Sequence, residues 1–114
     1  MALALNVFKT ITKIISTTPT EIYTAPVGYT GVVLLAQCTN VGPNSEDVTF
    51  NHRRTNTVGI AVTTELLSQY PISSKDTANL LSGKLVLESG DALEIRGTSS
   101  TNLKAIVSVL ETLN

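Results

Sequence analysis

Turn-forming residues recur along the whole chain and divide it into short segments rich in valine, isoleucine and threonine. These turn signals are Thr18-Pro19, Pro26 with Gly28, residues 40–47 (NVGPNSED), Tyr70-Pro71, Ser82-Gly83, Ser89-Gly90-Asp91 and residues 97–102 (GTSSTN). Turns at such intervals between β-branched runs are typical of β-sandwiches and β-barrels. We therefore expect an all-β fold, a single-domain antiparallel β-sandwich that is jelly-roll-like and has about eight strands.

The clearest strand is predicted over residues 92–97 (ALEIRG), where apolar and charged side chains alternate. Leu93 and Ile95 should face the core, because successive side chains of a strand point to opposite faces. Residues 84–88 predict a strand before it. Ser89-Gly90-Asp91 is expected to join the two in a hairpin, with the glycine at positive φ.

Residues 30–40 (TGVVLLAQCTN) form a continuous apolar run that predicts a central strand covered on both faces. Residues 47–54 (DVTFNHRR) are expected to be its neighbour, with Val48 and Phe50 inward. Residues 58–67 (VGIAVTTELL) and 70–72 (YPI) predict two further strands. The second should lie at an edge, because its proline cannot donate to a ladder.

Both ends of the chain fit either a helix or a strand. Residues 101–114 (TNLKAIVSVLETLN) carry a helical apolar stripe but also an alternating pattern in which Glu111 is the misfit. The β-branched run within them favours a strand, and the threonines of residues 8–17 favour the same there. We expect residues 1–16 to be an N-terminal arm or first strand that contacts another subunit, and residues 17–114 to be the sandwich domain.

The composition argues against several classes of partner. Charged residues make up 15% of the 114 residues and the formal net charge is −1, which is no electrostatic footprint for nucleic acid. No apolar run approaches the roughly 20 residues of a membrane span. The sequence thus predicts no nucleic-acid partner and no membrane partner. Cys38 is the only cysteine, so no intrachain disulfide is expected, and it should be a small buried hydrophobic residue.

No residue pattern predicts catalysis, a cofactor or a metal site. Gly83-Lys84 is followed by Leu85, so the phosphate-binding loop pattern fails. His52 is the only histidine and no nucleophile motif accompanies it. Arg53 and Arg54 could bind a carboxylate of a neighbouring subunit, or could be a solvated pair at a strand end. The protein is therefore expected not to be an enzyme, and its site to be a subunit interface that includes Leu3, Leu5, Val7, Phe8, His52, Arg53 and Arg54.

Three tyrosines could form a sugar-stacking platform of the kind that lectins use. Tyr23 and Tyr29 flank a corner of the chain made by Pro26 and Gly28, and Tyr70 lies far along the sequence. Packing of the first two over that corner is the simpler interpretation.

Several segments together resemble a known family. They are residues 22–31 with the sequence IYTAP and the glycine corner, Asn40, Pro71 with Ile72, residues 83–91 (GKLVLESGD), and the ending from Ser108 to Leu110. From about Thr17 onward the chain resembles small virion structural proteins of tailed bacteriophages, including those of marine cyanophages. The shared segments are turns and strand ends rather than catalytic motifs.

This resemblance implies a jelly-roll-like sandwich present in many copies on a phage particle and without an active site. Our prediction is a capsid decoration or cement protein of the virion, made in the bacterial host cytoplasm. Its partners would be itself, as a homotrimer, and the major capsid protein or other virion proteins. A tail, neck, baseplate or fibre component is the alternative, as is a module that binds a host glycan or receptor through residues 41–47 or 97–102.

Overall fold

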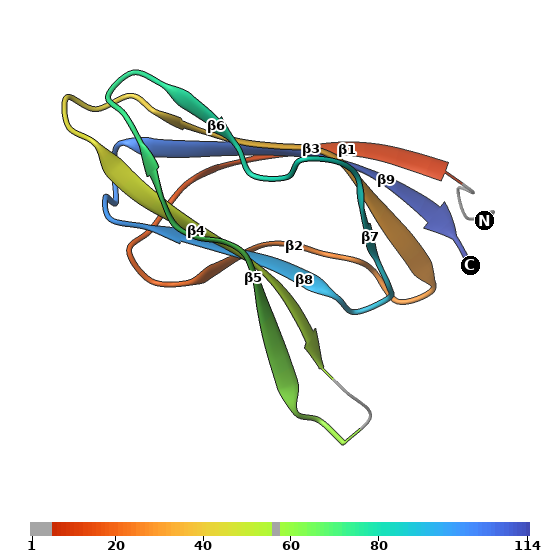
Figure 1. The fold of residues 1–114 in the computed structure, drawn as a ribbon. Coiled ribbons are helices and arrows are strands. Elements are labelled where there is room, and N and C mark those ends of the chain that lie inside the picture. Colours follow the sequence, from red (N-terminus) through yellow and green to blue (C-terminus); the bar gives the residue numbers. More distant parts are fainter. Residues whose placement is uncertain (1–5, 56–57) are drawn as a thin grey trace.

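The computed structural model describes residues 6–55 and 58–114, and in these ranges the chain contains strands and no helix (Figure 1). The strands are β1 (Asn6–Ile14), β2 (Thr20–Thr24), β3 (Tyr29–Asn40), β4 (Glu46–Thr55), β5 (Ala61–Ile72), β6 (Thr77–Asn79), β7 (Leu85–Leu87), β8 (Ala92–Gly97) and β9 (Leu103–Leu113).

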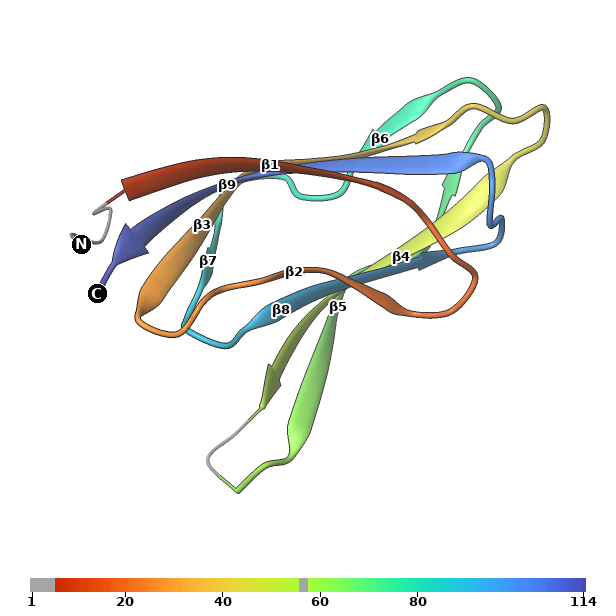
Figure 2. The same cartoon turned by 180° about the vertical axis from the view of Figure 1, so that it is seen from behind.

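The strands form two antiparallel sheets that face each other (Figures 1 and 2). Sheet A has the order β1-β9-β3-β6, with β7 also paired to β3, and sheet B has the order β2-β8-β4-β5. The short strands β6 and β7 pair with opposite ends of β3 and so share one position. The described part thus has nine strands in eight positions, which confirms the predicted antiparallel, jelly-roll-like sandwich.

The core lies between the sheets and is built by the period-2 alternation of each strand. Val48 and Phe50 of β4 are fully buried, as are Leu93 and Ile95 of β8. Their predicted inward orientation is confirmed. From sheet A, Val107 and its alternate neighbours along β9 close the core from the other side.

Both chain ends are strands, as the β-branched residues predicted. β1 and β9 pair along their length, from Asn6 opposite Thr112 to Ile14 opposite Lys104. Glu111, the misfit in the alternating pattern, points inward with the apolar residues of β9 and is 3% exposed.

Two predicted strand pairings are wrong. At both places the chain crosses from sheet A to sheet B, although the sequence predicted two paired strands of one sheet. β4 does not pair with β3 but lies in sheet B, beside β8 and β5. The turn at residues 89–91 leads from β7 in sheet A to β8 in sheet B, although Gly90 has the predicted positive φ of 87°. Alternation reveals which face of a strand is buried, but it does not reveal which sheet the strand joins.

The two strands predicted at 58–67 and 70–72 form one long strand, β5, which begins at Ala61, and residues 58–60 precede it. Gln69 adopts a φ of 47° within it, beside register shifts against β4 that keep the strand paired across the irregularity. β5 is the outer strand of sheet B, which confirms the edge position expected for Pro71. The β4–β5 hairpin extends beyond the body of the sandwich (Figure 1).

Replacement of Gly97 by alanine should destabilise the fold. A Cβ there would overlap Leu103 Cδ1 and lie 3.1 Å from the carbonyl oxygen of Asp47. Overpacking of this kind costs about 1–3 kcal/mol, so the urea midpoint of Gly97→Ala should fall. Gly83→Ala is the matched control, because a Cβ there meets no heavy atom within 4 Å and the φ is not positive. Equal midpoints for the two variants would contradict the packing.

Candidate functional site

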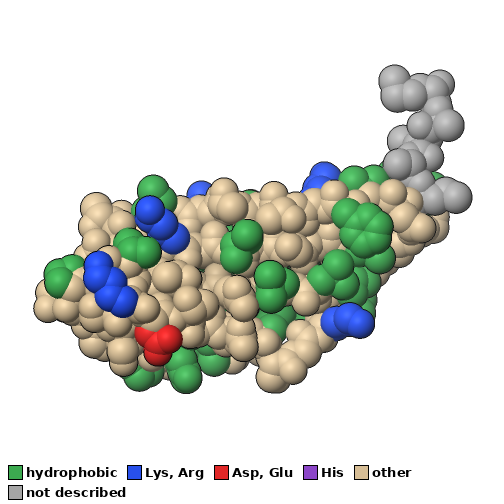
Figure 3. All heavy atoms as spheres, turned by 90° about the horizontal axis from the view of Figure 1, so that it is seen from above, with side chains coloured by type: hydrophobic (Ala, Val, Ile, Leu, Met, Phe, Trp, Pro, Cys, Tyr) green, Lys and Arg blue, Asp and Glu red, His purple; other side chains and the backbone are tan. Residues whose placement is uncertain are grey.

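The outer face of sheet A carries a row of apolar side chains across four strands. The register places Phe8 opposite Leu110, Leu110 opposite Val32, and Val32 opposite Val86. We call these four residues the apolar row. Phe8 is 74% exposed and Val86 is 56% exposed, and hydrophobic patches are visible over this face in Figure 3.

The strand predicted to be covered on both faces is covered only on its inner face within this chain. Leu34 and Leu35 of β3 are 39% and 40% exposed. A register shift between Val33 and Leu35 interrupts the alternation at this point, so neighbouring leucines both reach the surface. Contiguous exposed apolar area of this kind is typical of a surface that binds another protein.

Neutral polar side chains flank the apolar row and bond to one another across the strands. The hydrogen-bonded pairs are Thr10 with Ser108 (3.3 Å), Gln37 with Asn79 (3.0 Å), Thr39 with Thr77 (2.8 Å) and Thr112 with Asn6 (2.7 Å). Because these hydroxyls and amides already pair within the sheet, covering them leaves few polar groups without a partner. The face is therefore suited to burial against protein.

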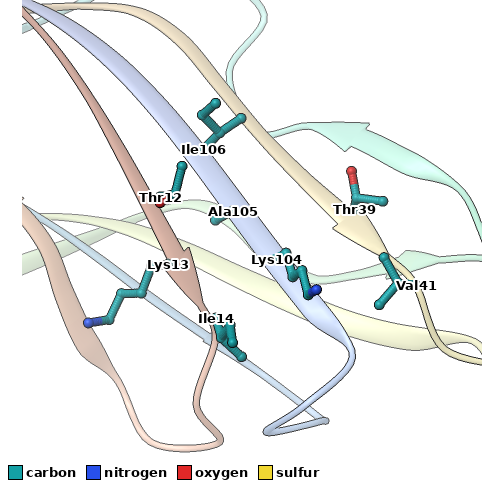
Figure 4. Close-up of a pocket in the computed structure, with 8 residues that line it drawn as sticks. All are labelled: Thr12, Lys13, Ile14, Thr39, Val41, Lys104, Ala105 and Ile106. Carbon is teal, nitrogen blue, oxygen red and sulfur yellow. The ribbon is translucent and has the colours of Figure 1, made fainter.

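A shallow depression of about 520 Å³ lies at the end of sheet A, where β1, β9 and β3 lie side by side (Figure 4). Ile14, Ile106 and Val41 supply apolar lining, and Lys13 and Lys104 extend to opposite sides of it. The lining residues include no acid, histidine or cysteine. The depression can accept an apolar side chain but offers no group for acid–base catalysis.

The outer face of sheet B differs in charge. The register places Glu21 opposite Glu94, Glu94 opposite Asn51, and Asn51 opposite Glu65. We call these four residues, three glutamates and one asparagine, the carboxylate row. The Nη1 atom of Arg53 lies 3.5 Å from the Oε2 atom of Glu94. Like charges directly opposite each other destabilise a sheet, so this row would be stabilised by positive charge from outside.

Asn51, in the middle of the carboxylate row, is 7% exposed. Among the described residues, its buried Oδ1 has no hydrogen-bond donor. A buried acceptor without a donor is costly.

A polar cluster fixes the turn before β8 to the base of the β4–β5 hairpin. Arg54 donates from Nε to Asp91 Oδ1 (2.8 Å) and from Nη2 to Asp91 Oδ2 (2.6 Å). His52 Nε2 lies 3.1 Å from the same Oδ2, and the backbone N–H of Glu88 donates to it at 2.9 Å. We call these residues the Asp91 cluster. The hydrogen bonds from Arg54, opposed by burial, lower the pKa of Asp91 to about 2.

A second buried carboxylate joins the two sheets near the chain terminus. Tyr23 of β2 donates its hydroxyl to Glu111 Oε2 (2.5 Å), and Lys9 Nζ lies 3.2 Å from Oε1. Burial, and then the bond to Glu111, raises the pKa of Tyr23. These partners explain how a charged residue is accommodated on the inner face of β9.

The predicted interface residues lie on different parts of the sandwich. Phe8 is exposed in the apolar row, and Val7 is half-buried on β1. His52 and Arg54 meet at Asp91, whereas Arg53 lies on the opposite side of β4 beside Glu94. Leu3 and Leu5 lie outside the described residues. Contact of these residues with another subunit stays a prediction.

The tyrosine platform is not formed. Tyr23 is 8% exposed with its hydroxyl bonded inside the sandwich, whereas Tyr70 is 46% exposed on the edge strand β5. Tyr23 is therefore buried inside the sandwich and not available for stacking on a sugar. Cys38 is also fully buried as predicted, and burial raises the pKa of its thiol to about 12, so it stays protonated.

The described ranges hold neither a cluster of metal-binding side chains nor a membrane-spanning helix. Residues 6–55 and 58–114 contain no group of three or more histidine, cysteine, aspartate or glutamate side chains placed to hold a metal ion. In the same part of the chain no helix is long and apolar enough to cross a membrane.

Sequence comparison and structure comparison give different results. No protein-family model and no curated protein matches the sequence. The fold, however, is similar to a chain of the T13 infectious bursal disease virus particle, with a TM-score of 0.60 and 10% identity over 97% of this chain. The present chain spans 32% of that longer chain.

Two other similar structures match over most of their length. One is from the capsid of Helicobacter pylori bacteriophage KHP30, with a TM-score of 0.56, 11% identity and coverage of 96% of this chain and 89% of that chain. The other is from the disulfide-linked pili of Bacillus endospore appendages, with a TM-score of 0.54, 15% identity and coverage of 100% and 97%. At these identities the similarity establishes the fold, which does not by itself establish the function.

Proposed function

We propose that the protein is a non-enzymatic structural subunit of a virus particle, a capsid decoration protein that self-associates and contacts other particle proteins. The observation that carries this proposal is the exposed apolar row on a sheet face whose polar side chains bond to one another. A monomer gains nothing from exposing Phe8 and Val86. A subunit that covers them in an assembly gains the free energy of their burial.

The similar structures support this proposal through the assemblies from which they come. Two of the three belong to a viral particle and a phage capsid, and the third belongs to a pilus. The phage capsid and pilus chains match nearly end to end, so one sandwich of this size can be the bulk of an assembly subunit. The resemblance to virion proteins of tailed phages points in the same direction.

Particles that lack this protein should lose resistance to heat and to osmotic shock. A protein that binds the assembled shell but not its free parts stabilises the shell by mass action, by about 2.7 kcal/mol when its free concentration is one hundred times Kd. The measurement compares genome release on heating between particles made with and without the protein. Added purified protein should restore the resistance of deficient particles. Identical release curves would contradict the decoration role.

A further inference from the structure

Positive charge is concentrated around sheet A. Lys104 lies on the outer face of β9, and Lys75 and Lys84 lie in the segments on either side of β6. Lys9 and Lys13 lie on the edge strand β1 opposite the inward-facing Val109 and Ala105, and Lys9 is paired with Glu111. Among the described residues, the acid on the strands of sheet A is Glu111, which is buried and faces inward, and Asp76 and Glu88 lie beside β6 and β7. The basic side chains visible in Figure 3 border the hydrophobic patches of this face.

Negative charge is concentrated on sheet B. The carboxylate row runs across its four strands, whose basic residues are Arg53, Arg54 and Arg96. Arg53 is held beside Glu94 and Arg54 beside Asp91, whereas Glu21 and Glu65 form no ion pair within the described part of the chain. Both are exposed. Exposed Lys104 on the outer face of sheet A and exposed Glu21 and Glu65 on the outer face of sheet B therefore make the two faces complementary in charge at these positions.

From this complementarity we infer that the outer face of sheet A of one copy docks on the outer face of sheet B of the next copy. Lys104 of one copy approaches the carboxylate row of the next copy. The apolar row of the first copy is covered by the sheet B strands that surround that carboxylate row. This inference rests on the proposed function and adds which surfaces meet. Pairing of two sheet A faces, or of two sheet B faces, would instead bring like charges together, which costs several kcal/mol in an interface.

A contact between two different faces is heterologous and can repeat. Because the two faces lie on opposite sides of the sandwich, repetition gives an open row of copies instead of a closed ring. The molar mass should therefore rise with concentration in low salt and fall toward the monomer mass of 12.1 kDa as salt screens the charges. A plateau at two or three copies would overturn the row, and a plateau at three would favour the predicted homotrimer.

Charge reversal of each face tests the contact by sedimentation velocity. Lys104→Glu and Glu65→Lys should each weaken self-association about tenfold or more, because each places like charges across the contact. Lys104→Arg keeps the charge and should associate like the wild type. Circular dichroism of each variant confirms that the fold is retained, since both side chains are exposed.

Restoration of the charge pairing gives the decisive comparison. The two single variants should associate with each other when mixed, and the double variant Lys104→Glu/Glu65→Lys should regain self-association at the wild-type net charge. Single variants that associate normally, or a double variant that stays monomeric, would overturn the contact. A wild-type protein that is monomeric in solution but present in particles would overturn the contact between copies and leave the proposed function standing. Absence from particles would remove the proposed function itself.

Discussion

Phe50→Ala is expected to lower the free energy of unfolding by about 3–5 kcal/mol, because it removes a ring from a closely packed core. Phe50 is fully buried on β4, where it lies opposite Ile95 of β8 and Leu67 of β5. A domain of this size has about 5–15 kcal/mol of stability, so the variant should unfold at a much lower urea concentration. The measurement is the urea transition followed by circular dichroism.

Phe8→Ala is the matched control, because it removes the same side chain from the outer face of sheet A. Phe8 is 74% exposed, so the free energy of unfolding should change by no more than about 0.5 kcal/mol. Self-association should weaken instead, since the ring belongs to the apolar row. Equal losses of stability in the two variants, or a loss below about 1 kcal/mol for Phe50→Ala, would show that the core is not built around Phe50.

Acidification should destabilise the fold through Asp91. Its pKa lies at about 2 in the folded protein against an ordinary value of 3.8. The folded state therefore holds the proton more weakly than the unfolded state. The stability that Asp91 contributes is complete above its unfolded pKa and is lost as the pH falls from about 4 through about 2. Urea midpoints measured across this range should decline steeply.

Asp91→Asn isolates the contribution of this one carboxylate. The amide keeps one acceptor but loses the charge that holds the Arg54 guanidinium in two hydrogen bonds. Hydrogen bonds to charged groups contribute about 1.5–3 kcal/mol, so the variant should be less stable than the wild type by that order at neutral pH. The difference should shrink toward pH 2. A difference that stays constant with pH would contradict the role assigned to the Asp91 charge.

The sequence predicted the class of fold because that class depends on local information. Turn residues and period-2 alternation are local, and they correctly placed Leu93, Ile95, Val48 and Phe50 in the core. The partner of each strand depends on residues far along the chain. For this reason β4 and the turn at residues 89–91 were assigned to the wrong neighbours, although their inward faces and positive φ were right.

The candidate surfaces were less predictable than the core. Phe8 was singled out because it belongs to an apolar terminus, but its row with Leu110, Val32 and Val86 exists only through the register of strands far apart in sequence. The carboxylate row was missed for the same reason. Glu111 was an anomaly in its strand, and that anomaly was the one sequence signal of a buried charged group.

The copy number of the protein in purified particles tests the central claim most directly. Quantitative mass spectrometry against the major capsid protein gives this number. The decoration role predicts a number comparable with that of the capsid subunit. A number that matches the low-order symmetry of a tail would move the protein to the neck, baseplate or fibre. Absence from particles would contradict the claim that it is a structural component of the virion.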